Sequence, residues 1–208
     1  STNMGICAII SGGEQARLTD IDKAQFVIAC DKGAEYAHRA DIVPDLLVGD
    51  FDSLNDADCV RAKKILRLPA EKNDTDTMFA VKEALKERFS EIYMYCAAGG
   101  RPDHFLGNLQ AAAFAAEKGV KTTIFSDSAT FYVFTNGSVE LVRRSGKFFS
   151  VIALSDRCVG VCIDGAKYPL DNAVITNDFP LGISNEWVQN TVKICVKSGV
   201  AVVVCAEE

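Results

Sequence analysis

Acidic and glycine-rich segments recur directly after short apolar runs in the first half of this 208-residue sequence. The five segments are residues 11–13, 31–33, 49–53, 72–76 and 99–104. The apolar runs before them are mostly unbroken, which is typical of parallel strands buried on both faces. The carboxyl ends of parallel strands lie along one edge of a sheet, where open α/β folds bind ligands. We therefore expect the five segments to line one crevice.

Carboxylates dominate this expected crevice. Taken singly, each has a structural explanation: Asp50 and Asp52 suit a turn, and Asp74 or Asp103 suits the start of a helix. Taken together, Asp31, Asp50, Asp52 and Asp76 would repel one another unless a cation neutralised them. Mg²⁺ prefers such oxygen ligands and completes its octahedron with substrate phosphates. The four aspartates are thus candidate metal ligands.

Phosphate-binding features accompany these acids. The pairs Gly12-Gly13 and Gly99-Gly100 allow backbone N–H groups to approach phosphate oxygens at the starts of helices. Arg101 can pair with phosphate through two hydrogen bonds, and Lys72 can act as a point charge. The residues alone therefore indicate Mg²⁺-dependent phosphoryl or pyrophosphoryl transfer without a P-loop.

The elements that must position these residues alternate between strand and helix. The strands are expected at residues 6–10, 26–30, 46–48, 65–68, 92–96 and 122–125. Helical patterns cover residues 56–64, 74–89 and 103–118, the last of which runs into Gly119. This order predicts an α/β fold with a mostly parallel sheet, assigned to a nucleotide-binding domain over residues 4–130.

The pattern changes in the second half, where only strands are expected. They cover residues 131–134, 138–141, 148–154, 159–163, 188–196 and 200–205, with turn dipeptides such as Asn136-Gly137 between them. In residues 191–197, Val192, Ile194 and Val196 alternate with Lys193, Cys195 and Lys197. An antiparallel β-sandwich over residues 131–208 is predicted.

Composition and charge indicate which partners and which location to expect. The net charge is −6 and the pI is near 5.0, without a Lys/Arg cluster, which argues against nucleic acid as a partner. No apolar run reaches the roughly 18 residues of a membrane span, and no leader pattern opens the chain. We expect a soluble, cytoplasmic protein with no membrane partner.

The eight cysteines do not suggest disulfides or zinc. Cys7, Cys30, Cys96, Cys195 and Cys205 lie within apolar runs, where reduced cysteine behaves as a small apolar residue. Cys158 and Cys162 have neither a second cysteine pair nor a nearby histidine. All eight are expected to be reduced.

At this point the sequence resembles the thiamine pyrophosphokinase family. The similarity spans nearly the whole chain in the family's order. The matching segments are Ser11-Gly12-Gly13, Asp31-Lys32-Gly33-Ala34, Gly49-Asp50-Phe51-Asp52-Ser53, Asp74-Thr75-Asp76, Gly99-Gly100-Arg101-Pro102-Asp103-His104 and Gly182-Ile183-Ser184-Asn185-Glu186. The family fold, an α/β domain followed by a β-sandwich, agrees with the two patterns above.

The resemblance implies transfer of pyrophosphate from ATP to the hydroxyethyl oxygen of thiamine, which releases AMP. It implies that Asp31, Asp50, Asp52 and Asp76 hold Mg²⁺ and orient the reacting oxygens, and that Arg101 and Asp103 shape the phosphate end of the site. Ser184 and Asn185 would bind the aminopyrimidine ring, at a site shared across a homodimer. The residues implied to bind ATP are Ser11, Gly12, Gly13, Asp31, Lys32, Gly33, Lys72, Asp74, Thr75, Gly100 and His104.

Two alternatives remain open at this stage. One is a diphosphokinase for another alcohol, such as a hydroxymethylpterin, which shares the metal-binding loops; the segment 182–186 argues against it. The other is a non-catalytic nucleotide or metal sensor that uses the same crevice.

Overall fold

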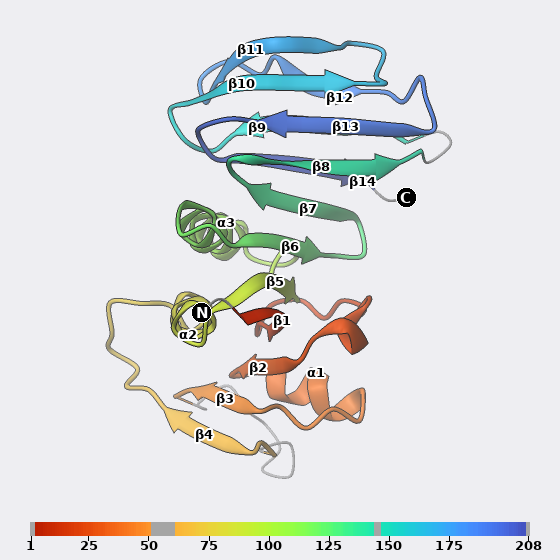
Figure 1. Cartoon of the computed structure of the whole chain (residues 1–208). Helices are drawn as coiled ribbons and strands as arrows, with labels where there is room; N and C mark the ends of the chain where they lie inside the picture. Colours follow the sequence, from red (N-terminus) through yellow and green to blue (C-terminus); the bar gives the residue numbers. More distant parts are fainter. Residues whose placement is uncertain (1–2, 51–60, 144–146, 207–208) are drawn as a thin grey trace.

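The computed structural model describes residues 3–50, 61–143 and 147–206, and within these ranges the strands form two sheets (Figure 1). The larger sheet has ten strands in the order β12-β9-β14-β7-β6-β5-β1-β2-β3-β4. The smaller has four, in the order β11-β10-β13-β8. The first half of the chain forms the lower part of the molecule in Figure 1, and the second half forms the upper part.

Six neighbouring strands of the large sheet are parallel. They are β1 (Asn3–Ile10), β2 (Phe26–Cys30), β3 (Leu46–Gly49), β4 (Lys64–Arg67), β5 (Phe89–Tyr95) and β6 (Lys121–Phe125). The central strand β1 is buried on both sides: Cys7 and Ile9 contact one core cluster, and Ala8 and Ile10 contact another. Burial on both faces is confirmed for β1, but the expectation is wrong for β4, which lies at the sheet edge and is mostly exposed.

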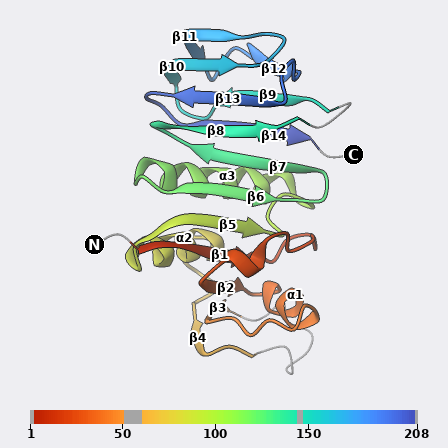
Figure 2. The same ribbon diagram turned by 45° about the vertical axis from the view of Figure 1, so that its right-hand side comes forward.

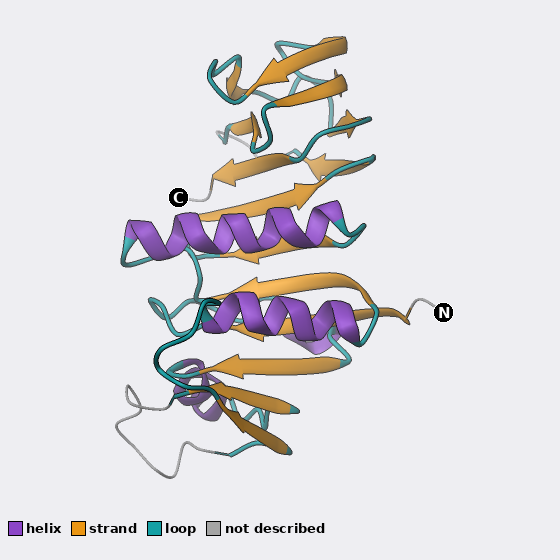
Figure 3. Ribbon diagram, turned by 90° about the vertical axis from the view of Figure 1, so that its left-hand side faces the viewer, coloured by secondary structure: helices purple, strands orange, loops and turns teal. Residues whose placement is uncertain are grey.

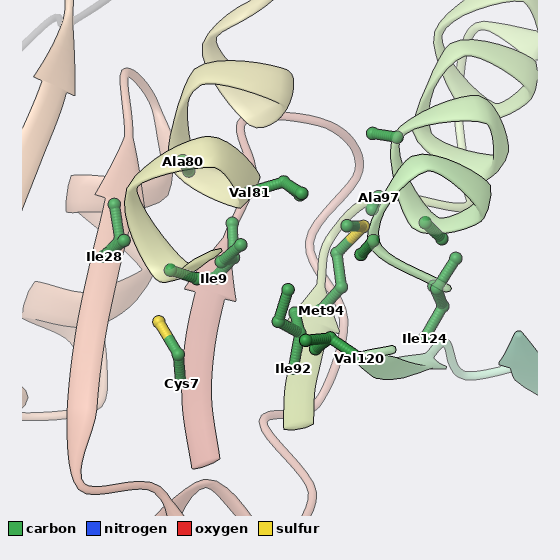
Figure 4. Packing of buried hydrophobic residues seen from close by; sticks show 14 of the residues in the cluster. Cys7, Ile9, Ile28, Ala80, Val81, Ile92, Met94, Ala97, Val120 and Ile124 are labelled. Atoms are coloured by element: carbon green, nitrogen blue, oxygen red, sulfur yellow. The ribbon is translucent and has the colours of Figure 1, made fainter. Parts of the chain in front are cut away.

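Among the described residues, three α-helices cover this part of the sheet: α1 (Gly33–Arg39), α2 (Asp76–Lys86) and α3 (Pro102–Glu117). Alanines such as Ala80 and Ala112 bring α2 and α3 close to the face that carries Cys7 and Ile9 (Figure 4). Tyr36 and Ala37 of α1 pack on the opposite face. Figure 3 shows α2 and α3 side by side in front of the sheet, with α1 behind it. The result is a three-layer α/β arrangement.

The large sheet continues into the second half of the chain, because β7 pairs antiparallel with β6. Its remaining strands are β7 (Ala129–Phe134), β9 (Phe149–Ala153), β12 (Gly182–Asn185) and β14 (Ala201–Ala206). The small sheet contains β8 (Gly137–Val142), β10 (Arg157–Asp164), β11 (Leu170–Thr176) and β13 (Thr191–Val196). Their inward side chains form one core, in which Trp187 contacts Phe149 at 5.0 Å between ring centroids.

The predicted antiparallel sandwich is therefore present, and one of its two layers is an extension of the parallel sheet (Figure 2). The expected boundary at residue 130 falls inside β7, where hydrogen bonds to β6 join the two halves. No helix is found in the described residues after Glu117, as expected. Strands β11 and β12 were not predicted.

Two predicted helices differ from the structure. Of the helix expected at residues 56–64, residues 56–60 lie outside the described ranges, and residues 61–63 are not helical. Lys64 begins β4 instead, because its amide donates to Asp45 O at the sheet edge. The helix expected at 74–89 begins later, at Asp76, and ends earlier, at Lys86; Arg88 has a φ of 61° and Phe89 starts β5.

In the described residues, no helix is both long and apolar enough to cross a membrane.

Candidate active site

A cavity of about 940 Å³ opens at the carboxyl ends of β1, β2 and β5, beside the N-termini of α2 and α3. The loops after these strands converge there, as the sequence predicts. The lining residues are Ser11, Gly12, Gly13, Glu14, Gln15, Cys30, Asp31, Lys32, Tyr36, Lys72, Thr75, Asp76, Thr77, Ala97, Gly99, Gly100, Arg101, Asp103, His104, Gly107 and Asn108.

Close backbone approach holds the first two loops together. A β-carbon on Gly33 would stand 2.2 Å from the carbonyl oxygen of Ile10, so that only glycine fits where α1 begins beneath the end of β1. The amide of Gly13 donates to Cys96 O at 3.0 Å, which ties the loop after β1 to the loop after β5. Three strand ends are thereby fixed around one cavity.

Asp31 follows β2 in a left-handed conformation, with a φ of 45°. Its amide donates to Val48 O at 2.9 Å, which places it over the end of β3. A β-carbon on Gly49 would stand 1.8 Å from Oδ1 of Asp31, so the carboxylate occupies the space above residue 49. Asp31 therefore lies next to the point where Asp50 leaves the sheet.

Lys72 and Asp76 form an ion pair within the cavity. The Lys72 Nζ lies 2.9 Å from Oδ1 of Asp76, and the two side chains are only 20% and 16% exposed. This contact with Asp76 raises the pKa of Lys72, and the charges of Asp31 and Asp50 raise it further. Three of the four predicted metal ligands thus act on one ammonium group.

The donor set of Asp31, Asp50 and Asp76 fits a hard cation, because all its atoms are carboxylate oxygens. Among the described residues, no three carboxylate, imidazole or thiol groups lie close enough to hold a metal alone. Mg²⁺ does not require such a cage, since one or two carboxylates, waters and substrate phosphates suffice. The fourth predicted ligand, Asp52, lies outside the described residues.

The N-terminus of α2 is held against the cavity by hydroxyl groups. Thr75 caps the helix: its Oγ1 accepts from the amide of Met78 at 3.0 Å. In the first turn of the helix, the hydroxyls of Thr77 and Ser11 are 2.7 Å apart in a buried contact. Asp74, expected to contact ATP, forms an ion pair with Lys82 at 2.7 Å. It is not among the described residues that line the cavity.

Arg101 and Asp103 meet at the start of α3 through two hydrogen bonds, of 3.2 and 2.8 Å. Both side chains are about two-thirds exposed. The pKa of Asp103 is lowered by its hydrogen bond from Arg101, and the backbone amide of His104 also donates to it at 3.0 Å. The pair presents a fork of guanidinium N–H groups at the mouth of the cavity.

Several lining residues were not predicted. Tyr36 donates from its hydroxyl to Gly13 O at 2.6 Å, and burial raises its pKa. Asn108 donates to Ala97 O at 2.8 Å, one turn and a half into α3. Burial raises the pKa of Cys30, and the charges of Asp76 and Asp31 raise it further. Helical spacing from Gly33 and from Arg101 is the sequence signal that could have found Tyr36 and Asn108.

Ser184 and Asn185 lie far from this cavity in the same chain, on the edge strand β12. Asn185 is 3% exposed, and its amide group is fully engaged with the backbone. Its Oδ1 accepts from the amides of Tyr168 and Glu186, and its Nδ2 donates to Tyr168 O, at 2.8–3.0 Å. Ser184 is exposed, with a φ of 58°. Asn185 thus fixes the backbone around Ser184.

Two family models match this chain. "Thiamin pyrophosphokinase, catalytic domain" matches residues 19–124, which include Asp31, Asp50, Asp76 and Arg101. "Thiamin pyrophosphokinase, vitamin B1 binding domain" matches residues 138–201, which include β12. The thiamine pyrophosphokinase of Bacillus subtilis (strain 168) is 29% identical over 205 residues, which cover 94% of this chain and 96% of that protein.

Solved structures agree with this similarity. The crystal structure of thiamine pyrophosphokinase from Bacillus subtilis has a TM-score of 0.86 at 26% identity, covering 98% of this chain and 99% of that one. That of Geobacillus thermodenitrificans has a TM-score of 0.80 at 25% identity, covering 98% of both chains. The Candida albicans protein shares the fold, with a TM-score of 0.79 at 17% identity over 99% of this chain and 90% of that one.

Proposed function

This chain belongs to the thiamin pyrophosphokinase family and is an enzyme of thiamine diphosphorylation, and we propose that it transfers the β,γ-pyrophosphoryl group of ATP to the hydroxyethyl oxygen of thiamine, releasing AMP. The observation that best supports the proposal is that Asp31, Asp76 and Lys72 line one cavity at the sheet edge, where the charge of Asp50 also acts on the Lys72 ammonium. Transfer of a phosphoryl-type group needs charge compensation and positioning more than covalent chemistry.

Asp31, Asp50 and Asp76, with Asp52, would hold Mg²⁺. When bound, the ion neutralises phosphate charge and aligns the reacting oxygens. Gly49 leaves room for the Asp31 carboxylate, and the Lys72 ammonium keeps the acids from repelling one another before substrate binds. These residues therefore prepare an acidic pocket that remains stable without ligand.

Backbone and cationic groups would bind the triphosphate. The N-terminus of α2, fixed by Thr75 and by the Ser11–Thr77 contact, directs N–H groups and a positive dipole end toward the cavity. Arg101 supplies a planar fork for phosphate oxygens once it exchanges Asp103 for substrate. Ser11, Gly12, Gly13, Lys32, Gly33, Gly100 and His104 remain the other proposed ATP contacts, with Asp74 supporting the loop through Lys82.

The proposed thiamine subsite requires a second subunit. In the large sheet, β12 is seven strand spacings of about 4.8 Å from β2, or about 34 Å, too far for thiamine at Ser184 to meet a phosphate at Asp31 in the same chain. Around β11 and β12, large apolar side chains are 47–64% exposed; they are Tyr168, Val174, Phe179, Leu181 and Ile183. A homodimer that covers them would bring the β12 of one subunit to the cavity of the other.

A cytoplasmic location is part of the proposal, because ATP is available there and six described cysteines are free thiols, namely Cys7, Cys30, Cys96, Cys158, Cys162 and Cys195.

The test is AMP release by the purified chain with ATP and Mg²⁺, with and without thiamine. AMP formed only when thiamine is present supports the proposal. AMP formed with a hydroxymethylpterin and not with thiamine would favour the other diphosphokinase. ATP binding without turnover of either alcohol would favour a sensor.

The shared site is tested by mixing Asp50→Asn with Asn185→Ala after subunit exchange, at a thiamine concentration well below KM, where the activity of each variant alone is low. Each mixed dimer would contain one site with both residues intact, so activity should return to about a quarter of the wild-type value at random pairing. Activity no higher than the sum of the two variants would contradict a site shared between subunits.

A further inference from the structure

Two cysteines that the proposed chemistry does not use face each other on the outer surface of the sandwich. Cys162 of β10 and Cys195 of β13 are direct partners in the antiparallel register of the small sheet. Both are unpaired thiols of intermediate exposure, whereas the other five described cysteines are buried. They are thus the accessible pair among the described thiols.

The alternation of each strand shows that both side chains point outward. Val161 and Ile163 on β10, and Val192, Ile194 and Val196 on β13, are buried in the sandwich core. Cys162 and Cys195 occupy the positions between them. Cys158 lies in the core instead, because the strand has a register shift around Gly160, whose φ is 66°. The spacing from Cys158 to Cys162 therefore does not place those two thiols on one face.

The register brings the two thiols within bonding range. Directly opposite residues of an antiparallel pair have α-carbons about 4.5–5.5 Å apart. Disulfides accept α-carbon separations of about 4.4–6.8 Å, so a bond between these residues needs no movement of the backbone. The next opposite pair on the same face is Asp164 and Lys193, and both residues are exposed. The Cys162 sulfur accepts from the amide of Asn172 on β11 at 3.5 Å, so its side chain must rotate toward Cys195 for the bond to form.

Positive charge surrounds one of the two thiols. Lys193 and Lys197 are exposed and lie two residues before and after Cys195; Lys193 is on the same face of β13, and Lys197 directly follows the strand. These ammonium groups would attract an anionic oxidant such as oxidised glutathione to a protein whose net charge is −6.

We propose that Cys162 and Cys195 form a reversible thiol–disulfide modification site that reacts with low-molecular-weight disulfides. One cysteine thiolate attacks the disulfide, forms a mixed disulfide and releases one small thiol. The second cysteine then attacks the protein sulfur of that mixed disulfide and releases the second small thiol. Two electrons pass from the protein thiols to the oxidant, and the two thiol protons end on the released thiols.

The bond would cross-link the two central strands of the small sheet and close a loop that contains β11 and β12. Such a cross-link restricts the unfolded chain and raises stability. The sandwich would then be more stable under oxidising conditions than under reducing ones. This inference does not depend on the proposed pyrophosphoryl transfer.

The experiment treats the purified full chain with oxidised glutathione and then measures intact mass, disulfide-linked tryptic peptides and Tm. We expect a mass about 2 Da below that of the reduced chain, a link between peptides 158–167 and 194–197, and a higher Tm. Dithiothreitol should reverse all three changes. Because peptide 158–167 contains two cysteines, Cys158→Ala is the matched control, and it should form the same link.

The single variants Cys162→Ser and Cys195→Ser distinguish this site from general oxidation. Each lacks the second thiol, so each should retain a glutathione adduct and show no rise in Tm. The proposal is overturned when the oxidised wild-type chain has no Cys162–Cys195 link, or when it retains glutathione as stably as the single variants. A link that disappears in Cys158→Ala would assign the bond to Cys158 and would also overturn it.

Discussion

The carboxylate of Asp31 occupies the space that a side chain on Gly49 would need: a β-carbon there would stand 1.8 Å from Oδ1 and 2.5 Å from Cγ of Asp31. Residue 49 also has a φ of +147°, which L side chains rarely adopt. Gly49 therefore leaves room for a residue of the neighbouring strand end. Because residue 49 has no side chain, the carboxylate of Asp31, which follows β2, can lie above the end of β3.

Gly49→Ala should displace the Asp31 carboxylate and reduce kcat at least about tenfold, with a loss of more than about 1 kcal/mol of stability from backbone strain. Steady-state kinetics and thermal unfolding measure the two effects. Gly137→Ala is the control, since its nearest neighbour would lie at 3.6 Å. Normal turnover in Gly49→Ala would mean that the position of Asp31 does not matter for the reaction.

Asp50→Asn and Asp52→Asn should each lower kcat by at least about 10², because each keeps the side-chain shape and removes a charged ligand. Circular dichroism should show an unchanged fold. Asp164→Asn, on the outer face of β10, should leave kcat unchanged. Near-wild-type turnover of either site variant, with Mg²⁺ as the sole metal, would refute its assignment as a ligand.

Lys72→Gln should increase the rise in Tm that Mg²⁺ produces. The Lys72 ammonium forms an ion pair with Asp76, so it competes with a metal ion for the same carboxylate. Thermal melts with and without Mg²⁺ measure the difference. Lys63→Gln breaks a comparable ion pair with Asp45 elsewhere and should respond to Mg²⁺ as the wild type does. Equal Mg²⁺ shifts in the wild type and Lys72→Gln would contradict binding at Asp76.

Asn185→Ala should cost about 1–3 kcal/mol of stability, because it leaves part-buried backbone groups of Tyr168 and Glu186 without their side-chain partner. The KM for thiamine should rise roughly tenfold while the KM for ATP stays constant, since the loop beside Ser184 loses its support. Trp187, buried against Phe149, reports the unfolding by fluorescence. Asn177→Ala, at an exposed position, is the control and should leave both KM values unchanged. A rise in the KM for ATP alone in Asn185→Ala would contradict a role of Asn185 in thiamine binding.

The parts of the fold that follow from local pattern were predicted well. Unbroken apolar runs such as Phe26–Cys30 predict a buried strand with few alternatives. Because the carboxyl ends of parallel strands lie along one edge of the sheet, this prediction also brings Asp31, Asp76 and Arg101 to one cavity. Strand β11 has a polar sequence with only Leu170, Val174 and Ile175 as large apolar residues, and β12 is short, so neither carries a strong local signal.

Features that depend on strand register or loop conformation were not accessible from the sequence. The opposition of Cys162 and Cys195 requires the pairing of β10 with β13. Likewise, an amide such as Asn185 could bind ligand or backbone, and only the path of the loop at Tyr168 shows that it binds backbone.

The most direct test follows the label from ATP that carries ³²P at the β-phosphate, with thiamine and Mg²⁺. Pyrophosphoryl transfer predicts that all the transferred label enters thiamine diphosphate, in amounts equal to the AMP released, and that none appears as ADP. Formation of thiamine monophosphate with labelled ADP would show transfer of a single phosphoryl group and would contradict the proposed reaction.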